Sequence, residues 1–99
     1  MKMAFVVCNT FFTDRVLKIL KENGIDYFTS WDNVKGKGRG TDPHLGVGSH
    51  PGMNSVTMIA FEEDASLEVL IRGINAANRE IQRADDHIRL FALPLERIV

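Results

Sequence analysis

The sequence of 99 residues contains a single cysteine, Cys8, and carries a formal net charge of only −1. One cysteine excludes an internal disulfide and a zinc site of four thiolates, and it is typical of a reducing compartment. A charge this close to zero argues against a dedicated nucleic-acid-binding protein, which normally presents a strongly basic face. No apolar run is long enough to cross a membrane, and no small-residue cleavage site follows the apolar start. We therefore expect a cytoplasmic protein without membrane insertion.

Apolar residues make up 44% of the sequence, and four short segments of them have the features of β-strands. Alternation of apolar and polar residues, together with β-branched and aromatic content, predicts strands over residues 3–9, 25–33, 55–61 and 87–93. The second strand is expected to continue towards Arg39, and Pro94 is expected to end the fourth.

Two amphipathic helices are predicted between these strands. Thr13 can cap the first helix, and Gly24 supplies a left-handed stop at its end. Asp64 can cap the second helix, whose apolar positions between 67 and 81 form one face. Gly73 within that helix indicates a close approach to the sheet. The order β-α-β-β-α-β predicts a ferredoxin-like α+β sandwich, with a long loop between the second and third strands.

A four-stranded sheet with two helices leaves one sheet face uncovered. Several large apolar residues are candidates for that face, namely Phe5, Val7, Phe28, Met58 and Phe91. An exposed patch of this kind indicates a partner, and self-association is the simplest one because identical chains carry the same patch.

The loop over about residues 36–54 is much longer than a tight hairpin requires, and long loops in compact domains are usually functional or disordered. At its start, glycines alternate with basic residues in the run Lys35, Gly36, Lys37, Gly38, Arg39. In an extended backbone the basic side chains share one side, and bare glycine lets backbone amides approach a phosphate. A solvated hairpin arm has the same composition, so the pattern alone leaves both interpretations open.

The loop also contains His44 and His50, with Asp42 and Met53 nearby, and imidazole and carboxylate groups can bind zinc or copper. The spacing of the two histidines fixes no ligand geometry, so solvated histidines are favoured and metal binding is an alternative. No serine, histidine and acid form a recognisable catalytic set, and Cys8 ends an apolar strand, where a structural thiol is the usual case. We expect a protein that is not an enzyme.

The run V-K-G-K-G-R over residues 34–39, and the ending L-F-A-L-P-L-E over residues 90–96, resemble the PII family of signalling proteins, also called nitrogen regulatory proteins. The resemblance extends over nearly the whole chain and implies a single PII-like domain over residues 1–99. It also implies a homotrimer whose exposed sheet faces pack together, with an adenine nucleotide as the small-molecule effector in clefts between subunits.

The same resemblance implies roles for individual residues. Those at the loop base and in the last strand would bind the ligand: Lys35, Gly36, Lys37, Gly38, Arg39 and Arg89. The long loop, the T-loop of the family, would change conformation with the ligand and contact a target protein, such as a transporter or a metabolic enzyme, through Asp42, His44, Leu45, His50 and Met53.

Two of the departures from the family pattern concern residues that bind the ligand in the family. Gly40 stands where many members carry a glutamine that helps hold magnesium and 2-oxoglutarate, which argues against sensing of 2-oxoglutarate. The glycine-rich segment before the last strand, which cradles phosphate in the family, is replaced by residues 79–87 without any glycine. The resemblance is therefore to a divergent PII-like protein, and a metal-responsive protein that uses His44 and His50 remains the alternative.

Overall fold

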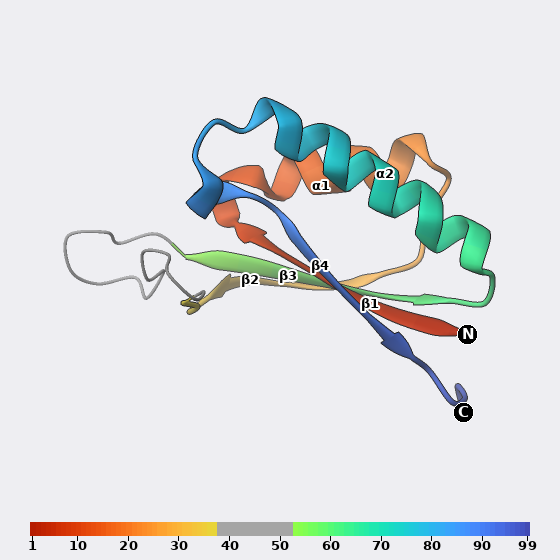
Figure 1. Cartoon of the computed structure of the whole chain (residues 1–99). Coiled ribbons are helices and arrows are strands. Elements are labelled where there is room, and N and C mark those ends of the chain that lie inside the picture. The colour runs from red at the N-terminus through yellow and green to blue at the C-terminus, as the bar shows by residue number, and fades with distance from the viewer. Residues whose placement is uncertain (38–52) are drawn as a thin grey trace.

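The computed structural model describes residues 1–37 and 53–99 (Figure 1). Four strands and two helices follow one another in the predicted order, with two short 3₁₀ turns, η1 and η2. Their bounds are β1 Lys2–Asn9, η1 Thr10–Phe12, α1 Thr13–Glu22, β2 Thr29–Val34, β3 Asn54–Phe61, α2 Asp64–Glu80, η2 Ala84–Asp86 and β4 Arg89–Pro94.

The strands form one antiparallel sheet in the order β2-β3-β1-β4. Both helices lie on the same side of this sheet (Figure 1). The predicted ferredoxin-like α+β fold is therefore confirmed. Among the described residues, no helix is both long enough and apolar enough to cross a bilayer.

Strict alternation along β1 and β3 divides the sheet into a covered face and an open face. In both strands every second residue is buried beneath the helices, because successive side chains point to opposite sides of a strand. The covered face packs against the apolar stripes of the two helices, which supply Val16, Ile19, Leu20, Leu67, Leu70, Ile74 and Ala77.

Both predicted helix caps are wrong. Thr13 and Asp64 are the first helical residues, and Phe12 and Glu63 hold the capping positions without a side-chain capping bond. The Thr13 side chain instead contacts the sheet: its hydroxyl forms a hydrogen bond of 2.7 Å with the hydroxyl of the buried Ser55 in β3. The predicted stop of the first helix is confirmed by the left-handed backbone of Gly24, with φ of 70°.

Gly73 provides a close approach between the two helices and not, as predicted, between a helix and the sheet. A Cβ atom at Gly73 would lie 2.6 Å from Cγ2 of Ile19 in α1. A glycine at this position therefore lets α2 pack tightly on α1.

The second strand is shorter than predicted, since β2 covers only Thr29–Val34, and its pairing with β3 is interrupted between Trp31 and Val34. Asn33 has a positive φ of 58° at this irregularity. Trp31 pairs with Val56 and so lies on the open face, whereas Phe28 lines a hollow beside Leu17 of α1. The prediction that Phe28 contributes to the open face is therefore wrong, and Trp31 contributes instead.

The fourth strand begins two residues later than predicted and includes Pro94. Proline lacks a backbone N–H, but it is tolerated here because β4 is an edge strand that pairs only with β1.

Candidate ligand-binding site at the base of the loop

The ends of all four strands meet at the base of the loop. Asn54, the first residue of β3, pairs with both Asn9 of β1 and Val34 of β2. On the other side of β1, Val7 pairs with Arg89, the first residue of β4. Residues far apart in the sequence are thereby placed around one end of the open face.

A hollow of about 260 Å³ lies at this end of the sheet. Val7, Val56 and Phe91 contribute an apolar floor, and the register places all three on the open face. This apolar floor is bordered by the loop base on one side and by the start of β4 on the other.

Four of the six residues predicted to bind a ligand line this hollow, namely Lys35, Gly36, Lys37 and Arg89. Among its described lining residues there are three cations against one carboxylate, that of Asp85. This balance favours an anion, and ammonium and guanidinium groups form strong, charge-assisted hydrogen bonds with phosphate or carboxylate oxygens.

Gly36 allows a close contact with β3. A Cβ atom at this position would overlap with Nδ2 of Asn54, which also lines the hollow. Any larger residue would have to displace the Asn54 side chain. The glycine therefore lets the loop base pack directly against the start of β3.

The segment between α2 and β4 also borders the hollow, through the side chains of Asp85 and His87. Arg83 pairs with Asp85 at 3.7 Å and with Asp86 at 3.9 Å. His87 Nε2 lies 3.0 Å from the carbonyl oxygen of Ile81, and because a carbonyl can only accept, Nε2 carries the proton in this bond.

Sequence reasoning missed Asn54, Asp85 and His87 as lining residues. The 3₁₀ turn η2, Ala84–Asp86, contains Asp85 and is followed directly by His87. Its proximity to the loop base depends on the sheet order, which brings the start of β4 next to the end of β1.

The remaining predicted loop residues, Gly38, Arg39, Asp42, His44, Leu45 and His50, lie outside the described residues. Met53 lies at the edge of the described part, and its carbonyl accepts a hydrogen bond of 2.8 Å from the backbone N–H of Thr10. Within residues 1–37 and 53–99, no group of three or more histidine, cysteine or acidic side chains could hold a metal ion.

Cys8 also lines the hollow, but it is not an activated thiol. Burial raises the pKa of Cys8 to about 11, and the nearby carboxylate of Asp32 adds to this, while a hydrogen bond with Thr13 acts in the opposite direction. The thiol is therefore protonated at neutral pH and has little nucleophilic character.

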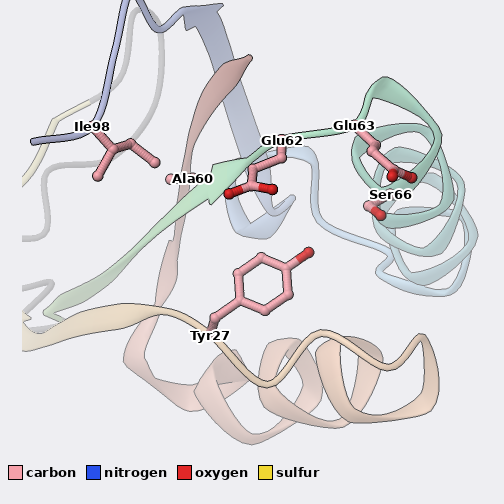
Figure 2. Close-up of a pocket in the computed structure, with 6 residues that line it drawn as sticks. All are labelled: Tyr27, Ala60, Glu62, Glu63, Ser66 and Ile98. Carbon is pink, nitrogen blue, oxygen red and sulfur yellow. The ribbon is translucent and has the colours of Figure 1, made fainter.

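A second hollow, of about 500 Å³, has the opposite charge character. Figure 2 shows Glu62 and Tyr27 facing it, with Glu63 and Ser66 at the start of α2. The ring of Tyr27 packs edge-on against Phe61, with 6.2 Å between ring centroids. The charged residues that line this hollow within the described chain are both carboxylates, so it does not suit a phosphate.

Comparison with solved structures identifies proteins with the same arrangement of strands and helices. One is CPII from Thiomonas intermedia K12 bound to ADP, AMP and acetate, with a TM-score of 0.67 and 14% identity over 92% of this chain and 81% of that chain. The fold is that of PII-like proteins. A second structure of CPII, described as a nitrogen regulatory PII-like protein bound to ADP, AMP and bicarbonate, gives a TM-score of 0.64 and 14% identity over 97% of this chain and 88% of that chain.

The similarity is visible in the structure but not in whole-sequence comparison. No protein-family model matches the chain, and no curated protein sequence matches it. At 14% identity the two CPII structures establish the fold.

Proposed function

We propose that this protein is a non-enzymatic, PII-like regulatory protein that binds an adenine nucleotide in the hollow at the loop base. The observation that carries the proposal is the convergence of Lys35, Gly36, Lys37 and Arg89 around one hollow, from two distant parts of the chain. The CPII structures, which share this fold, contain ADP and AMP, and this supports the choice of ligand.

The proposed chemistry is phosphate recognition. Lys37 and Arg89 would neutralise the phosphate charge, and the backbone of Gly36 would allow the phosphate to come close. Gly38 and Arg39 follow directly in the sequence and belong to the same proposed set. The apolar floor with Phe91 would contact the less polar part of the nucleotide.

We further propose that the protein assembles as a homotrimer through its open sheet face. The hollow lies at the end of this face, so a neighbouring subunit packed on it would complete the site. The long loop, including Asp42, His44, Leu45, His50 and Met53, would report the bound state to a target protein such as a transporter or a metabolic enzyme.

The first test combines a thermal-shift panel with titration calorimetry on the purified protein. ATP, ADP and AMP are compared with zinc, copper and nickel salts, because a ligand that binds only the folded state raises the unfolding midpoint. Arg89→Ala and Lys37→Ala should each weaken nucleotide binding by about tenfold to a hundredfold, the value of a charge-assisted hydrogen bond of roughly 1.5–3 kcal/mol.

The matched control is Arg72→Ala, because Arg72 is an exposed residue of α2 that does not line the hollow. This variant should bind the nucleotide with unchanged affinity, as should His44→Ala and His50→Ala. A shift with metal alone that is lost in the two histidine variants would instead support the metal-responsive alternative. Unchanged affinity in both basic variants would contradict the proposed phosphate contacts.

A further inference from the structure

The side chain of Asn78 makes a paired contact with the backbone of a residue ten positions later. Its Nδ2 donates to the carbonyl oxygen of Ile88 at 2.8 Å, and its Oδ1 accepts from the backbone N–H of Ile88, also at 2.8 Å. One amide side chain of α2 thus satisfies both backbone groups of Ile88, as a neighbouring strand would.

This contact lies where the pairing of the sheet ends. The ladder between β1 and β4 begins with Val7 and Arg89, so Ile88 is one residue beyond the last strand pair. Ile88 is only 2% exposed, and a buried backbone group without a hydrogen-bond partner is costly. The Asn78 amide provides the missing partner and extends the pairing of β4 by one residue.

The position of Ile88 determines where its neighbours point. Ile88 packs into the core under α2, and His87 before it has an extended backbone, with φ of −61° and ψ of 136°. Because successive side chains of extended chain alternate, His87 and Arg89 must point away from the core, and both line the hollow.

We infer that Asn78 is a positioning residue for the ligand site, which orients Arg89 towards the bound phosphate although Asn78 does not touch the ligand. The inference rests on the proposed function for the identity of the ligand. The segment between α2 and β4, residues 81–88, contains no glycine. Two side chains fix its backbone: Asn78 bonds to Ile88, and His87 bonds to the carbonyl oxygen of Ile81.

The test is a double-mutant cycle between Asn78→Ala and Arg89→Ala, with ADP binding measured by calorimetry. If Asn78 acts through Arg89, Asn78→Ala should weaken ADP binding about threefold to tenfold in the wild-type background, and by less than about twofold when Arg89 is already alanine. Asn75→Ala, an exposed asparagine one turn earlier in α2, is the matched control and should leave ADP binding unchanged.

Asn78→Asp is the second variant: it is nearly isosteric, and it replaces the N–H that donates to Ile88 by a carboxylate oxygen that can only accept. Because it also adds a negative charge, it is measured in both the wild-type and the Arg89→Ala backgrounds. It should also weaken ADP binding, and it allows the role of Asn78 to be tested even if Asn78→Ala folds poorly. Equal loss in both backgrounds, or no loss in either Asn78 variant, would overturn the positioning role.

Hydrogen exchange of the ligand-free protein separates this inference from the proposed function. Amides of residues 87–91 should exchange faster in Asn78→Ala than in the wild type and in Asn75→Ala. If the wild-type protein binds no adenine nucleotide, the proposed function fails, while unchanged exchange at residues 87–91 would independently overturn the role of Asn78.

Discussion

The two faces of the sheet are built from the same strands but have different environments. On the covered face Ala4, Val6, Ile59 and Phe61 are at most 1% exposed. On the open face the register aligns Phe5 with both Met58 and Phe91, and these residues are not buried; Phe91 is 56% exposed. The covered face is completed within one chain, whereas the open face keeps large apolar side chains exposed, which supports the proposed subunit interface.

The two ends of the sheet differ in charge as well. At the loop base the hollow is lined by Lys35, Lys37 and Arg89, while the hollow at the opposite end is lined by Glu62 and Glu63. Of these two hollows, the one at the loop base is the one that suits an anionic ligand. The contrast explains why the proposed site lies at the loop base although the hollow at the other end is larger.

The largest expected effect is on the covered face. Phe61→Ala should lower the free energy of unfolding by about 3–5 kcal/mol, because it removes a fully buried aromatic side chain and leaves a cavity. Urea denaturation at fixed protein concentration measures the change. Phe11→Ala is the control, since Phe11 is 83% exposed and its removal should change stability by less than about 0.5 kcal/mol. A loss below about 1 kcal/mol for Phe61→Ala would contradict the described core.

The next effect concerns the open face and the proposed trimer. Phe91→Asp would place a carboxylate in the interface, at a cost of about 2–4 kcal/mol per subunit. Sedimentation velocity should show the wild type as a trimer and the variant as a monomer that keeps its helical circular dichroism. Phe11→Asp changes an exposed aromatic residue outside the sheet and should remain trimeric. A Phe91→Asp variant that stays trimeric would exclude this face as the interface.

A smaller effect is expected from the pH dependence of stability. The pKa of Cys8 is raised from 9.0 to about 11 in the folded protein, so the folded state holds this proton more tightly than the unfolded state. The protonated thiol therefore adds to the free energy of unfolding below pH 9, and this contribution of about 2–3 kcal/mol is lost as the pH rises through about 11. Urea midpoints between pH 8 and 11 should therefore fall more steeply for the wild type than for Cys8→Ala. Parallel curves would contradict the burial of this thiol.

The sequence predicted the fold well because its strands and helices have strong periodicity. Alternation in β1 and β3, and the apolar stripes of the two helices, are local patterns that tertiary packing then preserves. The cap predicted at Thr13 failed because its hydroxyl bonds to Ser55, a partner that only the folded sheet brings near. The residue that faces the open side of the sheet was predicted wrongly near β2. Phe28, just before this strand, and Trp31 within it are both large and apolar but lie on opposite sides, so alternation did not show which one faces outward.

The candidate site could be predicted only in part. The alternating glycine and basic residues at 35–39 were visible in the sequence, but Arg89 was linked to them by resemblance to the PII family. Asp85 and His87 line the hollow because the sheet order places the start of β4 beside β1. Asn78 in α2 forms hydrogen bonds with Ile88, just before β4. Contacts of this kind have no periodic signature, so sequence patterns could not indicate them.

The most direct test of the proposed site is an NMR titration of isotope-labelled protein with ADP, followed through backbone amide shifts. If the hollow at the loop base is the site, the largest shifts should fall on residues 35–37, 54–56 and 87–91, and they should saturate. Shifts that cluster instead around Tyr27, Glu62 and Glu63, or no shifts at millimolar ADP, would contradict the account.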